Sequence, residues 1–229
     1  MGLAENLRAV QERVNNATLA AGREIGTVRL LAASKRTDAQ GVIDTIGLGH
    51  TLFGENRAQA LRDKFDVVHP LHSNAEWHFI GHLQKNKVKY IVGRASMIHS
   101  VDSMDLVEAV TARVQQQRRI GVSIAPMKML VQVKLGDEDS KTGTPVTDVF
   151  PLCEAIMARP ELELCGFMNI APLSGSPEQW FAEMAELAEE GRREGFPVQE
   201  MSMGMSGDME VAIQHGATIV RVGSDIYWA

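Results

Sequence analysis

The sequence predicts an α/β protein folded as a single (β/α)₈ barrel of the TIM type, with an N-terminal helix completing the outer ring. Short apolar runs alternate with longer amphipathic segments along the whole chain, and this alternation is typical of parallel strands joined by helices. Eight such runs are present, and eight parallel strands close naturally into a barrel. A doubly wound open sheet is the main rival, because the same alternation also builds it.

Each expected strand is a short apolar run, and each expected helix has apolar residues at helical spacing or a capping residue. The expected strands are 28–34, 52–53, 77–80, 97–101, 129–133, 162–170, 200–203 and 218–222. The expected helices are 1–21, 38–46, 56–65, 83–91, 105–118, 146–157, 177–193 and 208–214. Ser176 is the expected cap of the helix that begins at Pro177. No helix of comparable length is expected after the last strand, so the first helix should take that place in the ring.

The composition fits one globular domain, 1–229, with a substantial core. A formal net charge of −6 argues against a nucleic-acid partner. No run is long and apolar enough for a membrane span, and the charged N-terminus lacks the apolar core of a signal peptide. Cys153 and Cys165 lack metal or disulfide spacing and are expected to be reduced thiols. We therefore expect a cytoplasmic protein, monomeric or weakly dimeric, without a metal site.

In a barrel of this type the functional groups gather where the strands end. Lys35 directly follows the first strand. It is either a solvated lysine that closes the strand or a partly desolvated amine suited to forming an imine with an aldehyde. Position alone leaves both interpretations open.

The turns after the last two strands favour an anion site. Glycines and hydroxyls follow strand seven in the segment 202–208, and Gly223 and Ser224 follow strand eight. Such turns offer unpaired backbone N–H groups to a phosphate, and these two loops are the usual phosphate site of the barrel. The alternative is a pair of ordinary turns in which Ser206 and Asp208 cap a helix.

Arg221 lies inside the last strand, between Val220 and Val222. Because side chains alternate along a strand, the valines should face the helices and Arg221 the barrel interior. An inward arginine needs a partner or a ligand. Pairing with an acidic residue such as Glu55 would be a sufficient structural account.

Taken together, the sequence resembles the pyridoxal phosphate homeostasis proteins, the YggS/PROSC family, over nearly its whole length. The matching motifs are Leu31-Ala-Ala-Ser-Lys35, Phe53-Gly-Glu-Asn56, Trp77-His-Phe-Ile-Gly-His-Leu-Gln-Lys-Asn-Lys87, Asp139-Ser-Lys-Thr-Gly143, Gly166-Phe-Met168, Ser202-Met-Gly-Met-Ser206 and Val220-Arg-Val-Gly-Ser224. Each is weak alone, but jointly they are specific. The C-terminal Tyr227-Trp-Ala229 departs from the family's usual Phe-Gly ending.

The resemblance implies a site for pyridoxal 5′-phosphate (PLP). By it, Lys35 is the Schiff-base lysine and Arg221 faces the pyridine nitrogen. The phosphate-holding residues it implies are Ser202, Ser206, Gly223 and Ser224, and the residues lining the cofactor are Asn56 and Met205. Lys141 also matches a family lysine, and we assign it no role.

The resemblance implies a non-catalytic PLP-binding protein of intracellular PLP homeostasis, with PLP-dependent apoenzymes as possible recipients. The alternative is a small PLP-dependent amino-acid racemase, because the barrel is similar to the cofactor domain of alanine racemases. Those enzymes use a tyrosine as second base, and neither Tyr90 nor Tyr227 has an obvious route to the substrate face. A Schiff-base aldolase or phosphosugar isomerase is a third hypothesis, because barrel, lysine and phosphate loops would serve it too.

Overall fold

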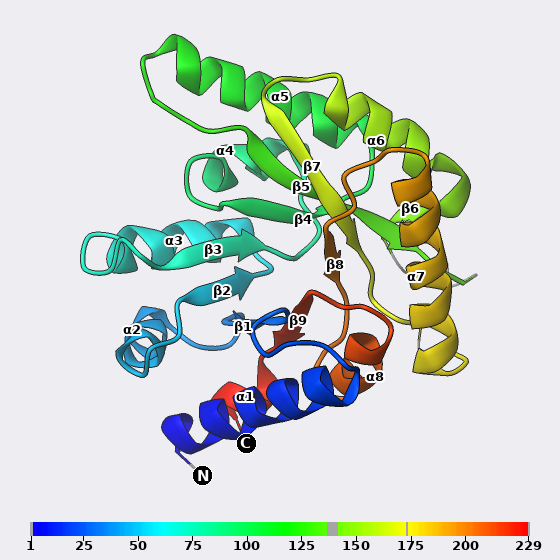
Figure 1. The fold of residues 1–229 in the computed structure, drawn as a ribbon. Helices are drawn as coiled ribbons and strands as arrows, with labels where there is room; N and C mark the ends of the chain where they lie inside the picture. Colours follow the sequence, from blue (N-terminus) through cyan, green and yellow to red (C-terminus); the bar gives the residue numbers. More distant parts are fainter. Residues whose placement is uncertain (1, 137–141, 173, 229) are drawn as a thin grey trace.

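The computed structural model describes residues 2–136, 142–172 and 174–228, and its strands form a closed parallel barrel (Figure 1). The strands of the barrel are β1 (Arg29–Ala33), β2 (Leu52–Glu55), β3 (Glu76–Phe79), β4 (Met97–Val101), β5 (Met127–Lys134), β7 (Leu162–Met168), β8 (Glu200–Ser202) and β9 (Ile219–Val222). Strand β1 pairs with both β2 and β9, and β4 pairs with β5, so the ring closes. An open doubly wound sheet would leave two unpaired edges, and this structure excludes it.

One further strand, β6 (Thr144–Pro145), pairs in parallel with the end of β5 outside the ring. The sequence pattern did not predict it, because two residues are too few to show a strand period. The motif 139–143 that precedes it falls largely outside the described residues, and so does Lys141.

The helices alternate with the strands as predicted. They are α1 (Leu3–Ala20), α2 (Ala39–Gly47), α3 (Ala58–Val68), α4 (Val88–Ile91), α5 (Met104–Arg119), α6 (Val149–Met157), α7 (Pro177–Arg193), α8 (Met209–Gln214) and α9 (Ser224–Tyr227). The N-cap of α7 is Ser176, whose hydroxyl accepts a hydrogen bond from the Gln179 amide.

The helix expected over 83–91 is wrong in extent. Only a 3₁₀ turn, Lys85–Lys87, leads into the single turn of α4. Lysines four residues apart, Lys85 and Lys89, repel each other on a helix. The burial of Val88 and Ile91 supports just the last turn. A second 3₁₀ turn, Val146–Asp148, likewise replaces the expected start of α6.

Helix α1 completes the outer ring, as predicted, by lying beside α8 and α9 (Figure 1). Its Val10 and Val14 are buried. The Asn6 side-chain amide donates to the backbone oxygen of Ile226 in α9 over 3.2 Å. The chain therefore brings its first helix against its last, which places α1 next to the turns that follow β8 and β9.

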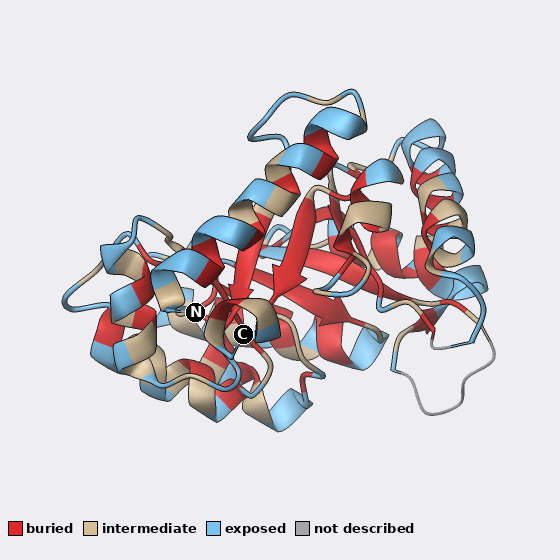
Figure 2. Ribbon diagram, turned by 90° about the horizontal axis from the view of Figure 1, so that it is seen from below, coloured by how far each residue is buried: buried red, intermediate tan, exposed pale blue. Residues whose placement is uncertain are grey.

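The strands form the buried centre and the helices shield them with one apolar face (Figure 2). Val220 and Val222 belong to the core between strands and helices. A second, smaller apolar cluster includes Leu31, Leu130 and Met168 and fills the barrel interior. The predicted alternation in β9 is confirmed, because Arg221 lies on the opposite side from the valines, toward the cleft. Within the described residues, no helix is both long and apolar enough to cross a bilayer.

Candidate functional site

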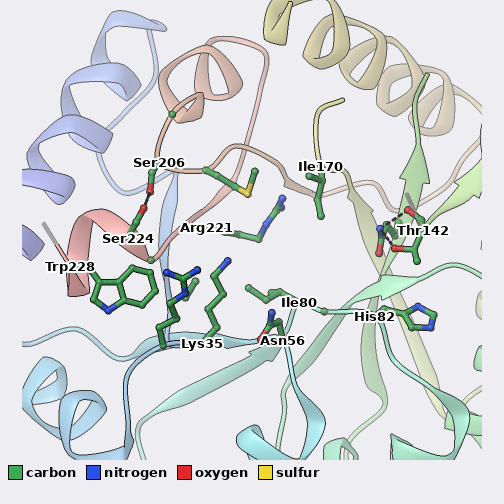
Figure 3. A pocket seen from close by; sticks show the side chains of 17 residues that line it. Lys35, Asn56, Ile80, His82, Thr142, Ile170, Ser206, Arg221, Ser224 and Trp228 are labelled. Carbon is green, nitrogen blue, oxygen red and sulfur yellow. Dashed lines mark hydrogen bonds between the residues drawn. The ribbon is translucent and has the colours of Figure 1, made fainter. Parts of the chain in front are cut away.

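A cleft of about 490 Å³ opens where the barrel strands end (Figure 3). Seven of the eight residues predicted for the site line it: Lys35, Asn56, Met205, Ser206, Arg221, Gly223 and Ser224. They come from the ends of β1, β2, β8 and β9. The cleft therefore lies where function is expected in this type of barrel.

Lys35 is positioned by the end of β1. The buried Ser34 before it donates its backbone N–H to the Gly54 oxygen over 2.9 Å, and its hydroxyl bonds a Glu55 carboxylate oxygen over 3.3 Å. From this anchor the Lys35 side chain extends into the cleft (Figure 3). The residue is exposed, which agrees with the first of the two interpretations that the sequence leaves open, a solvated lysine that closes the strand.

Glu55 supports the neighbouring strand end and does not pair with Arg221. Its carboxylate is buried, is bonded by the Lys64 amine and accepts the Asn56 backbone N–H over 3.0 Å. These bonds fix the backbone at Asn56, whose side-chain oxygen is buried with no partner among the described residues. The structural account of Arg221 through Glu55 is therefore wrong.

Arg221 is a buried cation, 6% exposed, held by neutral oxygens. Its Nη1 donates to the backbone oxygen of Ser202 over 2.6 Å and to the hydroxyl over 2.7 Å, while Nη2 donates to the Asn169 oxygen over 2.7 Å. No carboxylate of the described residues forms a salt bridge with it. Burial lowers the pKa of Arg221 to about 10, so it stays protonated at neutral pH. Its remaining N–H donors can serve a ligand in the cleft.

The turns after β8 and β9 meet at one side of the cleft. The hydroxyls of Ser206 and Ser224 lie 2.9 Å apart (Figure 3). Gly204 turns the chain with a φ of +91°, a conformation that L side chains rarely adopt. At Gly223 a Cβ would lie 2.8 Å from the Ala33 oxygen, so only glycine allows this approach to β1.

Backbone donors accompany these hydroxyls. The N–H groups of Ser206, Gly207 and Ser224 donate no hydrogen bond to any described residue. Two serine hydroxyls and such amides on converging turns form the donor set that a phosphate requires.

Arg13 of α1 ties the two turns together from behind. It forms salt bridges with Glu210 of α8 and Asp225 of α9, each at 2.8 Å. Its third contact is a hydrogen bond of 3.0 Å to the backbone oxygen of Ser206. The arginine thus neutralises two carboxylates that would otherwise repel an anion held at Ser206 and Ser224.

Ser202 differs from the other predicted residues, because it does not line the cleft. Its side chain is completely buried and its hydroxyl is engaged by Arg221 and His99. The pattern of two serines in 202–206 suggested a common role, but residues four apart here belong to a strand and to the turn after it. We therefore leave Ser202 out of the phosphate-holding set.

Sequence reasoning missed several cleft residues. Arg36 lies 4.5 Å from the centre of the Trp228 ring, and both line the cleft. The other missed residues are Ala33, Ile80, Gly81, His82, Gln132, Thr142 and Ile170, whereas Gly207 belongs to the segment 202–208 in which an anion site was expected. The sequence could have indicated Arg36, because it is a cation directly after Lys35, and Trp228, because it is an aromatic residue near the C-terminus.

His82 and the tyrosines bear on catalysis. The His82 ring lines the cleft 3.7 Å from an Asp102 carboxylate oxygen, but it points away from Lys35 (Figure 3). Neither Tyr90 nor Tyr227 lines the cleft. Tyr90 is surrounded by cations on the helix surface, and the Tyr227 hydroxyl lies 3.4 Å from Thr45. The His78 ring is buried against His99 and does not line the cleft.

The donor set fits a phosphorylated aldehyde with an aromatic ring nitrogen. Lys35 supplies an amine, Ser206 and Ser224 supply hydroxyls for a phosphate, and Arg221 supplies a cation that can only donate. Asn56 lines the same cleft. These are the groups that PLP requires. Fold and site together define a (β/α)₈-barrel protein with an amine and an anion-holding pair of turns at the mouth of the barrel.

Comparisons with known proteins place the chain within this class. The family model described as "Alanine racemase, N-terminal domain" matches residues 2–229. A pyridoxal phosphate homeostasis protein of Aquifex aeolicus is 36% identical, covering 99% of this chain and 98% of its own length. The Escherichia coli K12 protein of the same name is 32% identical, with 99% and 96% covered.

A solved structure has the same fold over the whole chain. PipY of Synechococcus elongatus, in a structure with PLP bound, superimposes with a TM-score of 0.81 at 27% identity, covering 99% of this chain and 100% of that one. The chain belongs to the pyridoxal phosphate homeostasis protein family, within the group described by the alanine racemase N-terminal domain.

Proposed function

We propose that this protein binds PLP as a Schiff base on Lys35 and serves intracellular PLP homeostasis. The observation that carries the proposal is the convergence of Lys35, Arg221 and the Ser206–Ser224 pair in one cleft of about 490 Å³. The PLP-bound structure of PipY and the names of the relatives support it. Ser206, Gly223 and Ser224, which line the cleft, would contact the phosphate, and Asn56 and Met205 would line the ring.

The permanent charge of Arg221 supports a protein that carries the cofactor without using it in a reaction. When bound, PLP supplies an electron sink for carbanions, and this sink is strongest when its ring nitrogen is protonated. An arginine that stays charged can donate a proton to a hydrogen bond but cannot accept one. Arg221 would therefore keep a ring nitrogen that faces it unprotonated. Two of its three hydrogen bonds are to backbone oxygens, so this orientation is built into the barrel.

The proposal therefore describes a non-catalytic carrier made of one domain, 1–229, that acts in the cytoplasm as a monomer or weak dimer. PLP-dependent apoenzymes are the proposed recipients. Two buried free thiols, Cys153 and Cys165, support a reducing compartment. Burial raises the pKa of Cys153 to about 12 and that of Cys165 to about 11, so neither is a nucleophile at neutral pH.

A small amino-acid racemase is the second candidate, and one observation favours it. His82 places an imidazole in the cleft, where a second base would be needed. Against it, the ring points away from Lys35 and neither tyrosine reaches the cleft (Figure 3).

The cofactor test compares Lys35→Ala, Lys35→Arg and Lys128→Ala with the wild type after PLP addition and borohydride reduction. Lys128 is exposed at the start of β5 and does not line the cleft, so it controls for surface labelling. The expected adduct maps to Lys35, disappears in both Lys35 variants and persists in Lys128→Ala. An adduct on another lysine, or none, would overturn the proposal.

A second test addresses turnover. Purified holoprotein is incubated with L- and D-alanine, and the products are separated by chiral chromatography. A carrier gives no racemisation beyond that of free PLP. Racemisation that His82→Ala abolishes would establish the racemase instead.

A further inference from the structure

A continuous chain of polar side chains crosses the interior of the barrel and ends on Arg221. His78 Nε2 lies 2.8 Å from a Glu76 carboxylate oxygen, and His99 Nε2 lies 2.9 Å from His78 Nδ1. On its other side, His99 Nδ1 lies 2.9 Å from the Ser202 hydroxyl, which accepts from Arg221 Nη1 over 2.7 Å. These residues come from β3, β4, β8 and β9, so the chain spans the barrel.

When both histidine rings are neutral, the two ends of the hydrogen-bonded chain determine the direction of every hydrogen bond in it. An arginine only donates, so the Ser202 oxygen accepts from Arg221 and its own hydrogen is available to His99 Nδ1. His99 then carries its proton on Nε2 and donates to His78 Nδ1, and His78 donates from Nε2 to Glu76. The carboxylate at the far end only accepts, which completes a single consistent pattern.

The charge states agree with this pattern. Burial lowers the pKa of both His78 and His99, so both rings are neutral. The hydrogen bond from His78 is the main reason that the pKa of Glu76 falls to about 2. Near the outer end of the chain, Arg29 lies 3.9 Å from Glu76 and pairs with Glu200 at 2.6 Å, while at the inner end the charge of Asp208 raises the pKa of Arg221 against the effect of burial. Arg29 and Glu200 balance each other at the outer end.

Because the side chains of this hydrogen-bonded chain are buried, each of them needs a hydrogen-bond partner. The side chains of His78, His99 and Ser202 are inaccessible to solvent, whereas Glu76 is partly exposed. The interior around them is otherwise apolar, with Met97 and Leu130 on neighbouring strands. A buried polar group without a partner costs about 1–3 kcal/mol, so each member keeps the next in place.

We propose that His99 and His78, anchored by Glu76, are positioning residues that hold the Ser202 hydroxyl and thereby fix the Arg221 guanidinium against the cleft. The inference rests on the proposed function in one respect, that Arg221 faces the PLP ring. Arg221 has no salt bridge among the described residues, and the hydrogen-bonded side chains give this buried cation a directed set of dipoles that ends on the carboxylate of Glu76. Neither histidine lines the cleft, so both would act on the site only through Ser202 and Arg221.

The test uses His99→Leu, His99→Asn and the control Met97→Leu, which changes a buried apolar side chain on the same strand. Nitrogen NMR of the wild type without PLP should show both histidines protonated on Nε2 only. His99→Leu should alter the Arg221 guanidinium signals and weaken PLP binding about tenfold, as expected for the loss of about one buried hydrogen bond. In His99→Asn the side-chain oxygen can accept from Ser202, so most of the affinity should return.

A purely structural role predicts something else. In that case His99→Leu and Met97→Leu would have similar effects, His99→Asn would rescue nothing, and the Arg221 signals would not move. Either that outcome or a proton on His99 Nδ1 in the wild type overturns the inference. A wild type that forms no adduct on Lys35 counts against the proposed function, whereas the NMR signals of the PLP-free protein still decide the role of His99.

Discussion

Arg13 offers a sharp test of how the phosphate-holding turns are stabilised. The substitution Arg13→Met keeps much of the aliphatic stem but removes the guanidinium. It deletes two salt bridges of 2.8 Å, to Glu210 and Asp225, and a hydrogen bond of 3.0 Å to the Ser206 backbone oxygen. Helix α1 would then lose its polar links to both turns through this residue.

The magnitude follows from the exposure of these groups. The Arg13 side chain is 39% exposed, and those of Glu210 and Asp225 are 40% and 32% exposed, so water screens both pairs. Partly exposed pairs of this kind contribute about 0.5 kcal/mol each. The hydrogen bond from a charged donor adds about 1 kcal/mol. The expected loss is about 2 kcal/mol, or about 4–8 °C in Tm for a chain of this length.

The assay is thermal unfolding of the PLP-free protein, with Arg8→Met as the matched control. Arg8 lies on the same helix, is exposed and makes no hydrogen bond or salt bridge with the described residues. Both variants remove one positive charge, so the control should stay within about 0.5 kcal/mol of the wild type. PLP affinity should also fall in Arg13→Met alone, because two carboxylates lose their counter-charge. Equal Tm values for the two variants would refute the reasoning.

Three further predictions concern the turn, the outer carboxylate and the rim. Gly204→Ala should lower the free energy of unfolding by about 3 kcal/mol in chemical denaturation, since its φ is +91° and a Cβ would lie 2.6 Å from a side chain of α8. Gly207→Ala is the control and should be nearly neutral, because a Cβ there would meet open space. Equal losses in the two variants would contradict this reasoning. The pKa of Glu76 is lowered to about 2, chiefly by the hydrogen bond from His78, so the contribution of Glu76 to stability is present above pH 4.5 and is lost as the pH falls toward 2. Glu76→Gln should therefore flatten that part of an acid-unfolding curve. An unchanged slope would argue against this role of Glu76. PLP should quench the fluorescence of Trp228, which lines the cleft, and Trp228→Phe should remove most of this quenching; undiminished quenching would place PLP elsewhere.

Much of the fold could be predicted because its signals are local. Strand β4 (Met97–Val101) and helix α7 (Pro177–Arg193) have the predicted bounds, since an apolar run and a Ser-Pro cap are properties of neighbouring residues. Strand β6 and the 3₁₀ turn at Lys85–Lys87 were not predicted. Both depend on what the segment packs against, which a period in the sequence does not record.

The cleft was predictable for a related reason. In a parallel barrel every strand ends at the same face, so a residue that follows a strand is already assigned to that face. Lys35, Asn56 and Ser224 reached the cleft in this way. Ser202 did not, because it is the last residue of β8 and its side chain points into the barrel interior.

The order of residues along the chain thus determined the barrel, the face that carries the site and the inward direction of Arg221. Only the tertiary structure decided the partners: Lys64 for Glu55, neutral oxygens for Arg221, and His99 for Ser202. His99 and Ser202 are 103 positions apart in the chain, and they meet because β4 and β8 both turn side chains into the interior of one closed ring. Such contacts form across space between strands, so no local period or spacing encodes them.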